Sequence, residues 1–410
     1  MLKFNLSKIK VAFTLVLIIL SSGYALSLGF QSEIMILSVM FIIVDMMMSG
    51  GKLKLTNNPL SFLVLIILQL GLALFANFDI SGVAEYIRIL VIYLFCYYVY
   101  ISYTSKDIFH VFSSFMFFIA VVSLVFYVWT ILFPSTVPTV QNGYGTKYMT
   151  CFFSFVNTDA SWRNCGIFWE PSVFSAMCFL WGIVEILLIR KLSQRKMRIV
   201  VLVITLLSTY STSGYVYLLF LLVMFLFRDD SRRYSLYRFA MSIVLLVIAV
   251  LVHFNYLEVL TKLVDINPLV FKKLMTSNVS VTDRTIGPLA DLYVALRYPF
   301  GIGLTNLTST VERVAYEVFE TPIYTRTSTI TYYCAAFGIL SGITVMVPLV
   351  NFVKRNVKSF FLFIVVSMGL VFMSLSTPLH DSAIFILLLF IGVQENNIKR
   401  EYTGFFQKRE

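Results

Sequence analysis

Charged side chains are scarce in this sequence. Only 13% of the 410 residues are Asp, Glu, Lys or Arg, whereas 59% are hydrophobic. A soluble domain of this composition could not hide its apolar surface from water. The shortage of charge therefore excludes a soluble globular fold, and it indicates a chain whose solvent is lipid.

Metal-binding residue types are also scarce, since the chain has three histidines and five cysteines. They form no cluster with the spacing of metal ligands, and no Asp-x-Asp pair lies in the expected exported loops, so we expect neither a metal nor another cofactor. Cys96, Cys178 and Cys334 fall within apolar runs. Cys151 and Cys165 lie outside them, where oxidising conditions would permit a disulfide, but two unpaired thiols are the simpler interpretation.

Apolar runs long enough to cross a bilayer are what the sequence has in abundance. We predict an all-α polytopic membrane protein with about 12 transmembrane helices, forming one membrane domain over residues 1–410. The predicted spans lie near residues 11–30, 33–49, 60–77, 83–103, 111–133, 168–189, 199–211, 214–227, 239–255, 328–352, 359–376 and 380–393.

Basic residues predict the orientation of these spans, because short cytoplasmic loops retain Lys and Arg. With the amino terminus inside, most of the 32 Lys and Arg residues fall in cytoplasmic segments, and both termini are cytoplasmic. Two large loops, residues 134–167 and 256–327, are then exported. Segments 259–274 and 285–296 read as interfacial helices or as helices packed on the bundle. The net charge of +11 reflects this retention and attraction to inner-membrane lipid, and it does not indicate nucleic acid.

The polar stretch at residues 163–172 connects the first exported loop to the sixth span. Pro171 suits the first turn of a helix, and Glu170 beside it favours the positive end of the helix dipole. A structural cap therefore accounts for Glu170 and Pro171. It does not account for Arg163, whose guanidinium stays available for a ligand.

Two further polar stretches fall on the same side. Asp283 and Arg284 are followed by Arg297 and by segment 299–303, whose two glycines allow a tight backbone. A hydroxyl-rich turn at 208–214 connects the seventh and eighth spans. Its hydroxyls either satisfy unwound backbone or line a polar cavity.

Charged groups in or beside the spans each need a partner or a function. Glu85 and Arg88 are three residues apart, so they share a helix face and either neutralise each other or bind a ligand. His380 and Asp381 begin the last span on the exported side. A histidine at a helix end is usually a boundary residue, but its titration range also makes it a candidate base.

Taken in chain order, these stretches resemble the O-antigen polymerases of the Wzy type, in the superfamily that includes O-antigen ligases and related polysaccharide polymerases. The matching residues are 163–172, 211–214, and Arg284 followed by 299–303. The helix count and the large late exported loop match as well, so the resemblance covers the whole chain.

The resemblance implies a glycosyltransferase of lipopolysaccharide O-antigen biosynthesis, acting at the outer face of the bacterial inner membrane. Its substrates would be undecaprenyl-pyrophosphate-linked oligosaccharides, and a chain-length regulator of the same pathway would be a partner. A guanidinium group can donate two parallel hydrogen bonds to phosphate oxygens, so we expect Arg163 and Arg284 to hold the pyrophosphate, with Arg88 and Arg297 as second choices. Arginines in these positions make a metal unnecessary.

The acceptor hydroxyl needs a base, and Glu170 is favoured because it shares a stretch with Arg163. The other candidates are Asp283, Glu312, His253, His380 and Asp381. Ligases of this superfamily typically carry a His-Asn pair before a helix that ends at a glycine, and the corresponding residues here are Arg326, Thr327 and Ser328. An O-antigen ligase or another polysaccharide polymerase stays open as an alternative. A flippase for lipid-linked oligosaccharides also stays open, although the chain shows neither related halves nor short loops throughout.

Overall fold

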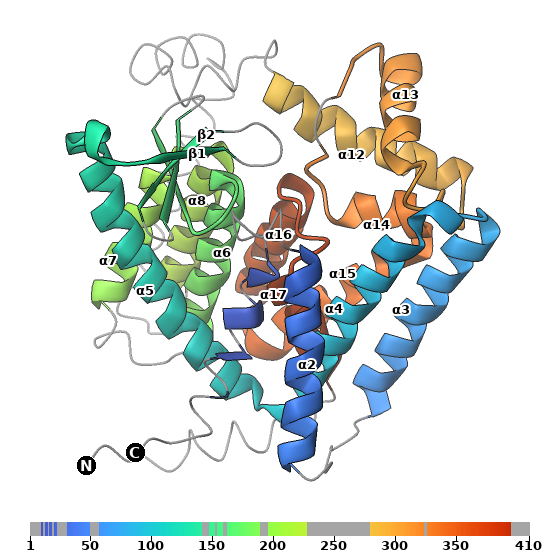
Figure 1. The fold of residues 1–410 in the computed structure, drawn as a ribbon, viewed down its shortest axis with the longest axis horizontal. Helices are drawn as coiled ribbons and strands as arrows, with labels where there is room; N and C mark the ends of the chain where they lie inside the picture. Colours follow the sequence, from blue (N-terminus) through green and yellow to red (C-terminus); the bar gives the residue numbers. More distant parts are fainter. Residues whose placement is uncertain are drawn as a thin grey trace.

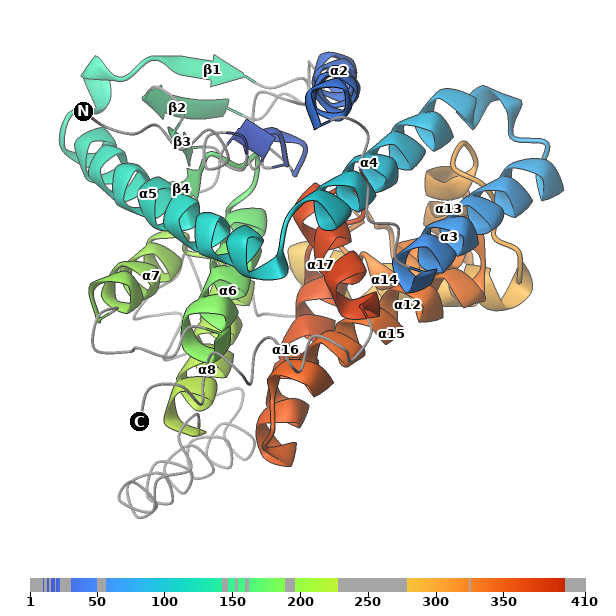
Figure 2. The ribbon, with the colours of Figure 1, turned by 90° about the horizontal axis from the view of Figure 1, so that it is seen from below.

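The computed structural model describes residues 10, 13–14, 16–18, 20–22, 31–49, 57–141, 147–151, 154–158, 162–188, 196–227, 279–323 and 326–394. This part of the chain is mostly helical, and its helices form two groups that flank α16 (Phe360–Ser376) and α17 (Ala383–Val393) (Figure 1). One group holds α5 to α8 and a small sheet, and the other holds α2 to α4 and α12 to α15. Figure 2 shows the same division from below.

Four helical stretches are long and apolar enough to cross a membrane. They are α3 (Asn57–Ala76), Ile80–Ser102 with α4 (Val83–Ser102), α5 (Ser105–Leu132), and Pro171–Leu188 with α6 (Pro171–Ile183). Shorter apolar helices are α8 (Thr212–Phe227), α16 and α17. The exposed faces of α3 and α5 carry large apolar side chains such as Leu68, Leu72 and Val125, as contact with lipid requires.

These helices agree with the spans predicted near 60–77, 83–103, 111–133 and 168–189. Helices α2 (Gln31–Ser49) and α7 (Lys196–Ser208) also lie where spans were predicted. The predicted span at 239–255 lies outside the described residues, as does most of the span at 11–30. The total of about 12 spans and their orientation therefore stay predictions.

The predicted span at 328–352 is interrupted. It consists of α14 (Ile330–Phe337) and α15 (Ile339–Asn356), separated by Gly338 with φ 94° and ψ 160°. A Cβ atom on Gly338 would lie 2.3 Å from the carbonyl oxygen of Pro299. Only glycine accepts that backbone conformation and that contact, so the segment cannot continue as one straight helix.

The segment predicted as the first exported loop, residues 134–167, contains a small antiparallel sheet, which the all-α prediction did not include. Its strands are β1 (Thr139–Gln141), β2 (Lys147–Cys151), β3 (Ser154–Asn157) and β4 (Arg163–Gly166), in the spatial order β1-β2-β3-β4. Tyr148, Phe155 and Cys165 pack together as a separate buried cluster on this sheet. Strands β3 and β4 contact α5, and β4 also contacts α6, so the sheet covers the ends of two apolar helices.

Cys151 and Cys165 are free thiols in this sheet. They lie on β2 and β4, which are separated by β3. Two strand spacings correspond to about 9.5 Å, beyond the Cα separation of about 7 Å that a disulfide can bridge. The simpler interpretation of unpaired thiols therefore agrees with the structure.

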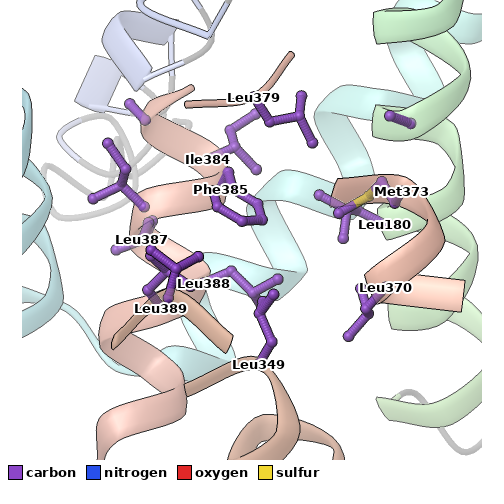
Figure 3. Close-up of a cluster of buried hydrophobic side chains, with 14 of the residues drawn as sticks. Leu180, Leu349, Leu370, Met373, Leu379, Ile384, Phe385, Leu387, Leu388 and Leu389 are labelled. Atoms are coloured by element: carbon purple, nitrogen blue, oxygen red, sulfur yellow. The ribbon is translucent and has the colours of Figure 1, made fainter. Parts of the chain in front are cut away.

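The hydrophobic core is centred on α17. Every residue of α17 from 383 to 392 is buried, as expected for a helix that is apolar on all sides. Figure 3 shows Phe385 and its neighbours on α17 facing Leu180 of α6 and Met373 of α16. This core holds the two helix groups together.

The described part of the segment predicted as the second exported loop, residues 256–327, contains two helices, α12 (Val279–Arg297) and α13 (Leu307–Phe319). Helix α12 covers the segment predicted as an interfacial helix at 285–296. It buries Ala290, Asp291 and Val294 and exposes Leu292 and Leu296, so it packs on α14 with one face and leaves apolar side chains on another. The predicted segment 259–274 lies outside the described residues.

Candidate functional site

Asn164 in β4 determines how the sheet meets the helices. Its side chain is fully buried, with Nδ2 donating to Ser208 Oγ at 3.0 Å and to Ser123 Oγ at 3.3 Å. Its Oδ1 accepts a hydrogen bond from the Gly166 amide at 2.9 Å. These bonds join β4 to α5 and to the end of α7, so the neighbouring Arg163 is held where three elements meet.

The hydroxyl-rich turn at 208–214 is held against α6. Tyr210 has φ 45°, a left-handed conformation that costs a non-glycine residue about 1–2 kcal/mol. Ser175 of α6 donates a hydrogen bond to Thr209 Oγ1 at 3.0 Å. A Cβ on Gly214 would lie 2.9 Å from Ser175 Oγ, so glycine at this position lets α8 approach α6 closely and holds the turn in place.

Arg163 and Arg284 meet on this turn. Arg163 Nε donates to the carbonyl oxygen of Thr209 at 3.3 Å. Arg284 Nη1 donates to Thr212 Oγ1 at 3.1 Å. The three polar stretches singled out in the sequence therefore contribute to one place: β4 supplies Arg163, α12 supplies Arg284, and the turn binds both. We call this group the arginine site.

The arginine site concentrates positive charge. Burial lowers the pKa of the Arg163 guanidinium, and the nearby charge of Arg284 lowers it as well. Cys165 and Glu170 act on this pKa in the opposite direction. In the described part of the chain, neither arginine forms an ion pair with a carboxylate. The Arg284 Nε atom is buried and has no hydrogen-bond partner there.

Two half-buried arginines that share a hydroxyl-rich surface suit an anion with several oxygens. Each guanidinium can present two parallel N–H groups to a phosphate or carboxylate, and the hydroxyl groups can donate to further oxygens. Comparisons with models of protein families, with curated proteins and with solved structures find no match for this chain. Its function therefore has to be inferred from the chemistry of these residues.

Glu170 lies at the entrance to α6 and beside Arg163. It occupies the N-cap position with extended backbone, and Pro171 follows in the first helical turn, as predicted. The Glu170 side chain makes no capping hydrogen bond, so a helix cap does not account for its carboxylate. Its charge instead opposes the lowering of the Arg163 pKa by burial, so it acts as a nearby counter-charge for that guanidinium.

Arg88 and Arg297 lie outside the arginine site. Arg88 pairs with Glu85, as their spacing predicted, and also with Asp381 at 2.6 Å. Arg297 is exposed at the end of α12, with its Cζ 5.9 Å from the ring centre of Tyr298. It lies about 20 Å along the helix axis from Arg284, so these two arginines cannot grip one small headgroup.

The glycines at 299–303 have a packing function. Gly301 and Gly303 have φ values of 81° and 75°, and a Cβ on Gly303 would lie 2.6 Å from Asp79 Oδ2. Asp79 accepts hydrogen bonds from the amides of Leu304 at 2.7 Å and Thr305 at 3.2 Å. The loop after α12 is thereby fastened to the start of α4. The sequence does not indicate this contact of Asp79, because Leu304 and Thr305 are more than two hundred residues away.

The remaining candidate bases are dispersed. Asp283 is buried on α12 beside Arg284, and Glu312 is exposed on α13. His253 lies outside the described residues. His380 and Asp381 lie together in the loop between α16 and α17, beside Arg88.

Proposed function

We propose that this chain is a membrane-embedded glycosyltransferase that polymerises oligosaccharides carried on a lipid pyrophosphate, as O-antigen polymerases do. The observation that supports this most is the meeting of Arg163 and Arg284 on one hydroxyl-rich turn. These residues are distant in the chain, and neither is neutralised by an ion pair in its described part.

The chemistry of such a transfer fits two fixed arginines. An acceptor hydroxyl attacks the anomeric carbon of the donor sugar, and the bond from that carbon to the pyrophosphate oxygen breaks. The electron pair leaves with the pyrophosphate, whose charge rises. Guanidinium groups that are already held by Thr209 and Thr212 stabilise this charge without having to reorganise.

The placement of the site supports a lipid-linked substrate. Arg163 lies in β4, just before α6, and Arg284 lies in α12, so neither is within one of the four helical stretches that are long and apolar enough to cross a membrane. We place this site on the exported side of the bacterial inner membrane, from the distribution of Lys and Arg. Undecaprenyl-pyrophosphate-linked repeat units are presented at that surface, and a chain-length regulator would act on the same enzyme.

Deleting the gene in its source bacterium tests this proposal. Loss of a polymerase leaves lipopolysaccharide that bears a single repeat unit, whereas loss of a ligase or a flippase leaves bare core. We expect the single-unit band, and bare core would contradict a polymerase.

Complementation of the deletion tests the two arginines. We expect Arg163→Ala and Arg284→Ala each to fail to restore the ladder at normal protein abundance. Arg297→Ala is the matched control, because this arginine is exposed at the far end of α12, and we expect a normal ladder. Normal ladders from all three variants would exclude the arginine site as the place where the donor binds.

A further inference from the structure

A second group of charges lies in the loop between α16 and α17, residues 377–382. Asp381 Oδ2 accepts a hydrogen bond from Arg88 Nη2 at 2.6 Å, and Arg88 also pairs with Glu85. His380 Nε2 lies 3.7 Å from the same Asp381 oxygen. Arg88 thus fixes a carboxylate next to the imidazole. We call this group the histidine cluster.

Aromatic packing also fixes the imidazole of His380. Its ring stacks on Tyr332 of α14, with ring centres 3.9 Å apart and planes inclined by 15°. The Tyr333 hydroxyl donates to the backbone oxygen of His380 at 2.9 Å. Arg326 packs on Tyr332 as well, with its Cζ 4.8 Å from the ring centre. A freely rotating surface histidine would have none of these restraints.

Helix α12 links the histidine cluster to the arginine site. Asp291 accepts from Arg326 Nη2 at 2.5 Å and from Thr331 Oγ1 at 2.8 Å. Arg284 lies seven residues before Asp291, so both are on one helix face, about 10 Å apart along the axis. The loop that carries His380 is also attached to α8, because the hydroxyl groups of Tyr217 and Thr377 share a hydrogen bond of 3.0 Å. Helix α12 and the loop at 377–382 therefore connect the histidine cluster to the arginine site.

Three polar atoms in the histidine cluster and in the neighbouring Arg326 are unsatisfied in the described part of the chain. His380 Nδ1, Asp381 Oδ1 and Arg326 Nε are each enclosed, and none has a hydrogen-bond partner among the described residues. Leaving a buried polar group unsatisfied destabilises the fold. The side chains of His380 and Asp381 are nevertheless 22% and 29% exposed, so the cluster is open to a ligand. An ion-pair network that served folding alone would be expected to satisfy these atoms.

We propose that the histidine cluster binds the acceptor sugar and that His380 takes the proton from its attacking hydroxyl. This inference rests on the proposed function of the arginine site. The partly exposed carboxylate of Asp381 would accept a hydrogen bond from a sugar hydroxyl, while Asp381 and Tyr332 orient the imidazole. The acceptor oxygen bonds to the anomeric carbon as its proton passes to a His380 nitrogen. The lipid pyrophosphate departs with the electron pair of the broken bond, and His380 later releases the proton to water.

The environment of His380 suits a base. Burial lowers the pKa of this imidazole, Asp381 and Glu85 oppose the change, and Arg326 and Arg88 reinforce it. The other ionisable groups packed around it are Tyr332 on α14 and Asp291 on α12. A lowered pKa leaves the imidazole neutral at neutral pH, as a proton acceptor has to be. The rate should therefore fall only in acid, below the ordinary histidine pKa of about 6.5.

Purified full-length protein in lipid nanodiscs tests the inference, with lipid-linked repeat units extracted from the deletion strain as substrate. We expect His380→Gln and His380→Ala to lower the polymerisation rate by about 100-fold or more, the usual contribution of a general base. Binding of undecaprenyl pyrophosphate, measured by thermophoresis, should stay within twofold of wild type. Imidazole added to His380→Ala should restore at least part of the rate. His110→Ala is the matched control, since His110 is exposed near the start of α5, and its rate should not change.

The pH profile separates a base from a structural residue. We expect the acid limb of the wild-type rate to disappear in His380→Gln. A rate within threefold of wild type, or a slow variant that keeps the same acid limb, would overturn the assignment of His380. If wild-type protein makes no polymer from these substrates, the proposed function itself fails, which is a different result from active His380 variants.

Discussion

Replacing the two arginines with lysine tests whether they grip one anion together. Lysine keeps the positive charge but offers a single point of contact in place of a planar fork. Hydrogen bonds to charged groups contribute about 1.5–3 kcal/mol each. Loss of one such bond from Arg163 or Arg284 should therefore lower kcat/KM for polymerisation by about 10- to 150-fold.

The double variant makes this test specific. If Arg163 and Arg284 hold the same pyrophosphate, their effects are coupled, and the combined loss should differ from the sum of the single losses by at least about 0.5 kcal/mol. The assay is polymer formation by purified protein over a range of repeat-unit concentrations. Arg297→Lys serves as the control for charge and abundance, since its side chain is exposed. Single variants within twofold of wild type, or losses that simply add, would refute a shared anion.

Three predictions concern the structure that supports the site. Gly338→Ala should destabilise the protein by about 2–6 kcal/mol, through an unfavourable backbone conformation and overlap with Pro299, whereas Gly71→Ala, with open space around it, should not lower the melting temperature. Asn164→Ala removes three buried hydrogen bonds, so it should lower both the melting temperature and the polymerisation rate. An unchanged rate would show that the position of β4 does not matter for the site. In a variant that keeps only Cys151 and Cys165, thiol labelling should be the same with and without reductant. Cys165 should stay unlabelled at pH 8, because burial raises its pKa to about 12.

Local sequence patterns were sufficient for the apolar helices and for some contacts. Helices α3, α4 and α5 lie where composition predicted spans, because continuous apolar runs of this length leave few alternatives. The pairing of Glu85 with Arg88 follows from a spacing of three residues on a helix. The second partner of Arg88, Asp381, lies almost three hundred residues later, and no local pattern indicates it.

The sheet and the helix break were missed for different physical reasons. Strands β1 to β4 have three to five residues each, too few for an alternating pattern to be distinguished from a polar loop. The break at Gly338 depends on the carbonyl of Pro299, which is distant in the chain. A glycine within an apolar run does not by itself indicate such a contact.

The candidate site was predictable in part. Residue type and place in a family-like order indicate Arg163 and Arg284, and the structure brings both to the turn at 208–214. Arg297 was selected by the same reasoning, but helix geometry carries it away from Arg284. The contact of Arg326 with Asp291 and with Tyr332 depends on how α12 packs on α14, so it could be found only from the fold.

Direct binding of the lipid headgroup tests the central claim most simply. Purified wild-type protein and the Arg163→Ala/Arg284→Ala double variant are titrated with undecaprenyl pyrophosphate, with Arg297→Ala as the control. We predict binding by wild type and control, and a loss of at least 100-fold in affinity for the double variant while its melting temperature stays unchanged. Equal affinity in all three proteins would contradict the account.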